Sequence, residues 1–138
     1  MRLPLPLLVL AALAPGAAAE DLPGWPAEMT RACLDDARDD AEYRACYAAT
    51  RAALDTAIAA ELARLERLAA TNPEPEAAEM TRLIRAVAEA RSRAAGLECA
   101  FETFESRDGS AHDLHFAPCL IAKRAGLLGY LSQQGRLP

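Results

Sequence analysis

The sequence predicts an all-α fold: a disulfide-stapled bundle of about four helices with a long central antiparallel helix hairpin. Ala, Leu, Arg and Glu, which favour helices, dominate two long segments of the chain. Within these segments apolar residues recur every three or four positions, and no segment shows the alternation of a strand. Four cysteines lie nearly symmetrically about the predicted turns, which indicates disulfides at one level of the bundle.

The first nineteen residues have the pattern of a secretory signal peptide. Arg2 supplies a positive start, residues 3–13 are mainly apolar, and small residues precede Glu20. The apolar run is shorter than the roughly 20 residues that a membrane-spanning helix needs. We therefore expect cleavage between Ala19 and Glu20, a periplasmic or secreted location, no membrane span, and a single domain over residues 20–138.

A short first helix is expected over residues 27–36, after an irregular leader at residues 20–26. Pro26 suits the start of a helix, where a missing backbone N–H breaks no hydrogen bond. Asp39 is the expected N-cap of the next helix, with Glu42 three residues later in the capping-box position. A turn therefore separates the two helices.

The second predicted helix covers residues 40–70 and would span roughly 45 Å, since each helical residue rises 1.5 Å. The helical pattern stops at residues 71–75, where Pro73 and Pro75 break it. Its apolar residues, spaced mostly three or four apart, predict the face that enters the core. These residues are Tyr43, Tyr47, Leu54, Ile58, Leu62, Leu65 and Ala69.

The third and fourth predicted helices cover residues 76–104 and 117–133. The third has an apolar stripe whose spacings alternate between three and four, which predicts packing against a neighbouring helix. This stripe consists of Met80, Leu83, Val87, Ala90, Ala94, Leu97, Phe101 and Phe104. The fourth helix carries Leu120, Ile121, Leu127, Leu128 and Leu131.

The four cysteines of an exported domain predict two disulfides, for which three pairings exist. No C-x-x-C pair is present, which argues against zinc or thioredoxin-like chemistry. Shorter loops close more readily, so we favour Cys33 with Cys46 and Cys99 with Cys119. The alternative joins Cys46 to Cys99 and Cys33 to Cys119, lacing the long hairpin.

The expected functional face is the end of the bundle that holds the turn at residues 35–40 and the loop at residues 105–118. Binding groups concentrate on loops that a rigid scaffold holds. The formal net charge is −5, or −6 without Arg2, which argues against nucleic acid and anionic membranes and favours a cationic partner. The candidate partner-binding residues are Asp35, Asp36, Asp39, Arg107, Asp108, Gly109, Ser110, His112 and Asp113.

His112 and His115, with Asp113 between them, are a candidate metal site, because two histidines at this spacing can share a metal on a helical turn. Gly109 and Pro118 instead predict a loop, and no further ligands are evident. The sequence contains no phosphate-binding loop and no H-E-x-x-H motif. We therefore expect no metal, no cofactor and no catalytic residue.

Several segments carry a resemblance to a known family. They are the cysteine pair with twelve residues between Cys33 and Cys46, the register Ala53-Leu54-Asp55, the stretch from Ala90-Arg91 to Glu98-Cys99-Ala100-Phe101, the turn Gly109-Ser110 and the closing Cys119-Leu120. In this pattern, over residues 33–131, the chain resembles the LprI-like lysozyme-inhibitor family of small exported bacterial proteins. The resemblance implies a periplasmic or extracellular helical domain that inhibits lysozyme.

Two functions stay open at this point. The chain is a lysozyme inhibitor that blocks the cleft of a cationic muramidase, or it is a non-inhibitory structural or interaction protein of the cell envelope with the same fold. The first is the leading hypothesis, because an acidic bundle end would steer encounter with a basic enzyme. The sequence leaves the oligomeric state open.

Overall fold

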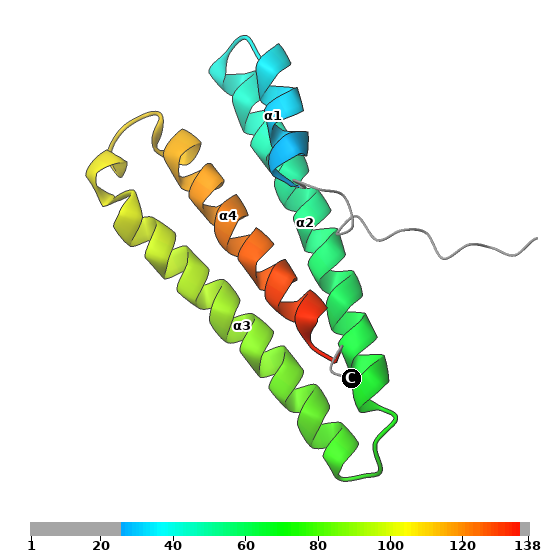
Figure 1. Cartoon of the computed structure of the whole chain (residues 1–138). Helices are drawn as coiled ribbons and strands as arrows, with labels where there is room; N and C mark the ends of the chain where they lie inside the picture. Colours follow the sequence, from blue (N-terminus) through cyan, green and yellow to red (C-terminus); the bar gives the residue numbers. More distant parts are fainter. Residues whose placement is uncertain (1–25, 136–138) are drawn as a thin grey trace, which may run out of the picture.

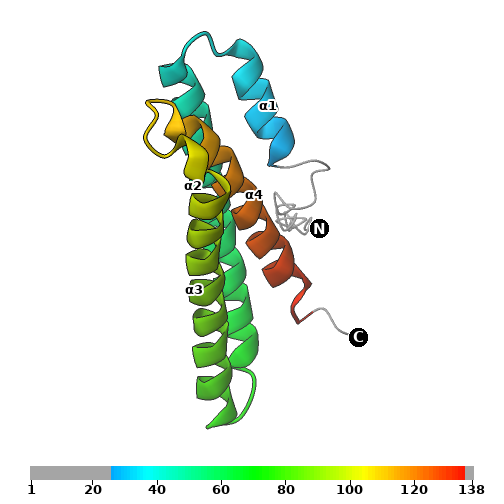
Figure 2. The same cartoon turned by 90° about the vertical axis from the view of Figure 1, so that its left-hand side faces the viewer.

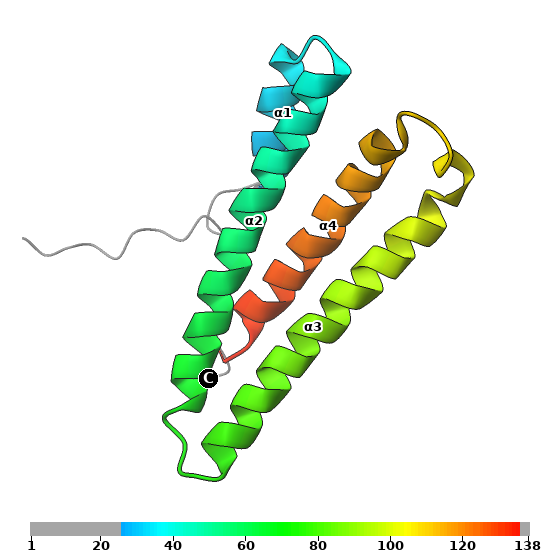
Figure 3. The ribbon, with the colours of Figure 1, turned by 180° about the vertical axis from the view of Figure 1, so that it is seen from behind.

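The computed structural model describes residues 26–135, which form four α-helices and no strand. The helices are α1 (Ala27–Asp36), α2 (Asp40–Ala69), α3 (Glu76–Glu102) and α4 (His112–Gln133), with the short 3-10 helix η2 (Phe104–Ser106) after α3. Helices α2 and α3 form the long hairpin, and α4 returns between them (Figures 1 and 3). The predicted helical bundle is confirmed; the predicted signal peptide lies outside the described residues.

Helix α1 turns back along the start of α2 and lies on the side of the bundle remote from α3 (Figure 2). The turn ends where Asp39 caps α2: the Glu42 N–H donates to Asp39 Oδ1 at 2.9 Å. The Arg38 N–H in turn donates to Glu42 Oε2 at 2.6 Å. The predicted capping residues, Asp39 and Glu42, are confirmed. The Glu42 side chain accepts its hydrogen bond from the N–H of residue 38, one residue before the cap residue.

The disulfide pairing is the one with the shorter loops. Cys33 bonds to Cys46 and Cys99 to Cys119, with Cα atoms 5.7 Å apart in each pair, inside the usual range. The first bond joins α1 to α2, and the second joins α3 to α4. The favoured pairing is therefore confirmed, and the hairpin-lacing alternative is wrong.

The main core is an aliphatic seam between α2 and α4. Every apolar residue predicted for the α4 core is buried, as are Leu54, Ile58 and Leu65 of α2. Tyr47 and Leu62 are half-buried and pack against them. The periodicity of both helices therefore predicted their buried faces correctly. The seam consists of Leu54, Ile58, Leu65, Ile121, Leu127, Leu128 and Leu131.

Helix α3 packs on a different face from the one that its apolar stripe predicts. Leu97 is 68% exposed, Phe101 83% and Phe104 52%. Met80 and Leu83 are also exposed, as are the stripe alanines, and Val87 is half-buried. The packing predicted for this stripe is therefore wrong from Ala90 onward, whereas its first residues, from Met80 to Val87, line a hollow between α3 and the other two long helices. The residues that α3 buries are small: Ala77, Ala88, Ala95 and Cys99.

The disulfide explains this orientation. Cys99 is two residues from Leu97 and two from Phe101, so it points about 200° around the helix from each of them. Because Cys99 bonds to Cys119 of α4, both large side chains point away from α4. The small residues on the Cys99 side let the helix backbones approach closely. The end of the stripe, at Leu97 and Phe101, is thus a face of α3 that no other helix in residues 26–135 covers. Its beginning, over residues 80–87, lines a hollow together with Leu65 of α2 and Leu131 of α4.

Helix α4 begins at His112, five residues before the predicted start at Ala117. The prediction of a loop over His112, Asp113 and His115 is therefore wrong. Pro118 lies inside the helix, where it removes the N–H that would bond the Leu114 carbonyl. Packing of Phe116 and Leu120 in a small cluster with α3 holds the helix across the proline, so tertiary contacts override the local signal. Likewise, α3 ends at Glu102 rather than at the predicted residue 104.

An ion pair within α2 positions an arginine that reaches the end of α4. The Glu61 side chain is only 8% exposed, and Arg64 Nε donates to its Oε2 at 2.7 Å. Arg64 Nη2 also donates to the carbonyls of Leu131, at 3.1 Å, and Gln134, at 3.0 Å. Carbonyls at a helix C-terminus lack partners within the helix. Arg64 donates to the Gln134 carbonyl and is a second donor, beside the Gln134 N–H, to the Leu131 carbonyl, in addition to pairing with the buried carboxylate.

We predict that Arg64→Met lowers the free energy of unfolding by about 3 kcal/mol, because it leaves Glu61 buried without its counter-charge. Urea unfolding of the oxidised protein measures this effect. Arg67→Met is the control, since Arg67 is exposed one turn away on the same helix and has no ion pair within residues 26–135. Equal, small effects of the two substitutions would contradict this role of Arg64.

Candidate functional site

The structure places the α1–α2 turn and the α3–α4 loop at the same end of the bundle, opposite the connection between α2 and α3 (Figure 1). Asp35 and Asp36, which end α1, and Asp39, which caps α2, are exposed on either side of the turn. Arg107, Asp108 and the glycine-serine turn are exposed on the loop. The predicted partner-binding residues thus share one end of the molecule but lie on two separate segments.

The α3–α4 loop is a run of tight turns. The Gly109 N–H donates to the Ser106 carbonyl at 2.9 Å, and the His112 N–H donates to the Gly109 carbonyl at 3.1 Å. A Cβ atom at position 109 would lie 3.2 Å from the Ser106 carbonyl oxygen, so glycine suits this close approach. The Ser106 hydroxyl donates to the Thr103 carbonyl at 2.9 Å, which leaves His112 Nδ1, 3.2 Å away, as donor to that hydroxyl. The loop therefore holds its residues in fixed positions.

Arg44 of α2 anchors the end of this loop. Its guanidinium forms a bidentate pair with the Asp113 carboxylate, through Nε to Oδ2 and through Nη2 to Oδ1 at 3.3 Å. Nη2 also lies 3.3 Å from the Ser110 carbonyl, to which it donates. The hydrogen bond from Arg44 holds the pKa of Asp113 below its ordinary value. Asp113, a predicted partner-binding residue, is thus already paired within the chain.

No local pattern in the sequence indicates a role for Arg44. Its two partners lie 66 and 69 residues away along the chain, and Arg44 itself occupies an ordinary exposed position of a helix rich in arginine. Only the antiparallel packing of α4 on α2 brings the three residues together. Arg44 is therefore the positioning residue that sequence reasoning missed.

We predict that Arg44→Gln raises the pKa of the Asp113 carboxyl toward its ordinary value. Because the folded pKa lies below the unfolded one, the ion pair stabilises the fold above the unfolded-state pKa and loses this effect as pH falls through the folded pKa. An NMR titration of the side-chain carboxyl carbons measures the change. Arg38→Gln on the α1–α2 turn is the control, and an Asp113 pKa unaltered by Arg44→Gln would contradict the pairing.

The other charged and histidine side chains predicted for the loop and its border contact residues close to them in the sequence. The Arg107 guanidinium carbon lies 3.8 Å from the centre of the Phe104 ring, and its Nε lies 3.6 Å from Asp108 Oδ2. His112 is half-buried, and its ring centre is 5.7 Å from that of Phe116. His115 is exposed. Over residues 26–135 no group of three or more His, Cys, Asp or Glu side chains is placed to hold a metal ion.

An exposed apolar patch lies where α3 leads into this loop. It consists of Leu97, Phe101 and Phe104, and we call it the α3 apolar strip. Carboxylates border it at Glu98 and Glu102, to which Lys123 Nζ donates at 2.7 Å and 3.0 Å. These bonds hold the pKa of Lys123 above its ordinary value.

The border of the α3 apolar strip is acidic on balance. Glu105 and Asp108 are exposed close by in the sequence, so four carboxylates share two cations, Lys123 and Arg107. Sequence reasoning missed the strip as a site because it assigned these residues to the core. The position of Cys99 between Leu97 and Phe101 was the signal that could have revealed it.

Over residues 26–135 no helix is both long enough and apolar enough to cross a membrane. The two disulfides are typical of proteins in oxidising compartments. Comparison of the chain with protein-family models, with curated proteins and with solved structures gives no match.

Proposed function

We propose that this protein is an exported binding protein that docks on a cationic protein through the α3 apolar strip. The observation that carries the proposal is the exposure of Leu97 and Phe101, one helical turn apart near the end of α3, and of Phe104 in η2 directly after it. Single exposed apolar residues are common on protein surfaces, but adjoining aromatic side chains are typical of interaction sites. The strip borders a tightly hydrogen-bonded loop, so little order has to be gained on binding.

The charge distribution supports a cationic partner. The strip has a carboxylate-rich border, and the exposed aspartates of the α1–α2 turn lie at the same end of the bundle (Figure 1). The whole chain carries a net charge of −5. Opposite charges around an apolar contact increase the association rate and disfavour wrong partners. The acidic border would therefore steer a basic protein onto the apolar strip.

A lysozyme-type muramidase is the proposed partner, on the basis of the LprI-like resemblance of the sequence. Such enzymes bind sugar in a cleft that carries two carboxyl groups. Arg107, held over the Phe104 ring, is the cation at the tip of the strip that would reach those carboxyl groups. The strip would then cover the cleft and exclude substrate. Export to the periplasm or the exterior, expected from the signal-peptide pattern, would bring the two proteins together.

We predict that replacing both Leu97 and Phe101 by Ser weakens lysozyme inhibition at least tenfold, since two central apolar anchors are lost from the interface. The assay follows the clearing of a cell-wall suspension by a basic lysozyme in the presence of the oxidised mature protein. Leu83→Ser is the matched control, because Leu83 is an exposed leucine of the same helix farther from the loop. Circular dichroism establishes that each variant is folded.

Equal loss of inhibition in the double variant and the control would contradict the placement of the site on the strip. A folded, oxidised protein that inhibits no lysozyme would contradict the muramidase as partner. In that case capture of a single stoichiometric envelope protein, abolished in the double variant, would support the alternative of a non-inhibitory interaction protein.

A further inference from the structure

We propose that the groove between α2 and α4 binds a small organic anion with an apolar body, held by Arg51. This α2–α4 groove has a volume of about 420 Å³, which lies within the range of small-molecule pockets. It is separate from the α3 apolar strip, which faces away from α4, so the inference does not rest on the proposed function.

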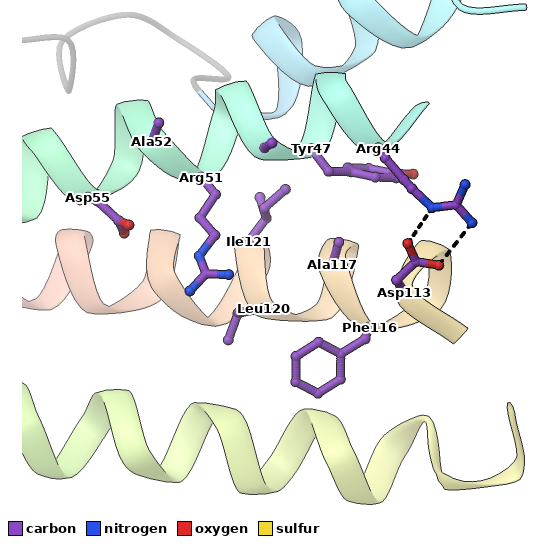
Figure 4. Close-up of a pocket in the computed structure, with 11 residues that line it drawn as sticks. Arg44, Tyr47, Arg51, Ala52, Asp55, Asp113, Phe116, Ala117, Leu120 and Ile121 are labelled. Carbon is purple, nitrogen blue, oxygen red and sulfur yellow. Dashed lines mark hydrogen bonds and ion pairs between the residues drawn. The ribbon is translucent and has the colours of Figure 1, made fainter. Parts of the chain in front are cut away.

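The groove exists because small residues occupy the α2 side. Ala48 and Ala52, one helical turn apart, leave open the space that larger side chains would fill. From α4, Ile121 points toward α2, and Phe116 and Leu120, which project on the α3 side of α4, complete an apolar lining (Figure 4). The hollow is therefore lined mostly by apolar atoms, with few polar groups to orient a ligand. This combination is typical of ligand-binding pockets.

Three charged groups of α2 line the groove, and two of them are neutralised. Arg44 pairs with Asp113 at one end, and Asp55 pairs with Arg124 at the other. Arg51 lies between these pairs and extends toward α4 (Figure 4). Among the residues that the structure describes, no carboxylate lies within ion-pair distance of Arg51. The groove therefore carries a net positive charge at its middle, although the whole protein is acidic.

This arrangement fits an amphipathic carboxylate. A guanidinium binds a carboxylate through two parallel hydrogen bonds, so Arg51 would fix the head group. The alkyl or aryl body of the ligand would lie against Phe116 and Leu120. A cationic ligand of the same shape would meet Arg51 with like charge, and a neutral one would lose the ion pair. The groove is therefore selective for an anion.

Isothermal titration of the oxidised mature protein with sodium decanoate, below its micelle-forming concentration, tests this inference. We expect saturable binding at one site, weakened at least tenfold by Arg51→Gln. Arg67→Gln is the matched control, since Arg67 is exposed on the same helix outside the groove. Decyltrimethylammonium, with the same chain and the opposite charge, should not compete with decanoate.

A second variant tests the cavity itself. Ala52→Leu fills the groove without changing charge, so it should abolish decanoate binding while the circular dichroism spectrum stays that of the wild type. Absence of saturable binding by the wild-type protein would overturn the proposal. Equal affinities of the Arg51→Gln and Arg67→Gln proteins, or equal binding of the ammonium probe, would overturn it too.

Discussion

The aliphatic seam between α2 and α4 determines where every other element lies. Each fully buried Leu or Ile side chain contributes about 1.5–3 kcal/mol to folding, and the largest cluster of such side chains in residues 26–135 lies in this seam. Helix α1 buries none of its own residues, and α3 buries only three alanines and a cysteine. Each of these two helices is joined by a disulfide to one of the helices that form the seam. The two disulfides thus attach α1 and α3, the helices that bury the fewest large apolar side chains.

The use of small residues at the helix contacts also produces the exposed surfaces. Because α3 turns its small residues inward, its large apolar residues remain outside, next to the loop that the second disulfide closes. Because α2 presents Ala48 and Ala52 toward α4, a hollow remains near Arg51. Both proposed sites therefore arise from alanine-lined contacts between helices. The strip would bind through exposed aromatic area, whereas the groove would bind through a single unneutralised cation.

Local signals in the sequence predicted the helices well. The Asp39 cap and the proline at position 73 each act within a few residues, so the bounds of α1 and α2 and the start of α3 follow from the sequence almost residue by residue. The proline at position 118 led to a wrong prediction of where α4 begins. There, tertiary packing outweighs the one hydrogen bond that the proline removes. Cysteine symmetry predicted that the turn and the loop share one end. The Arg44–Asp113 pair depends on two helices far apart in sequence, so no local pattern could reveal it.

The stripe on α3 shows what periodicity leaves open. Heptad spacing tells which residues share a face, but it does not tell whether another helix covers that face. Urea unfolding of Ala95→Leu and Leu97→Ser compares the two faces most directly. Burial of Ala95 predicts that a larger side chain there lowers the free energy of unfolding by about 1–3 kcal/mol, while exposure of Leu97 predicts a change within about 0.5 kcal/mol. A tolerated Ala95→Leu together with a strongly destabilising Leu97→Ser would contradict this orientation of α3, and with it the apolar strip.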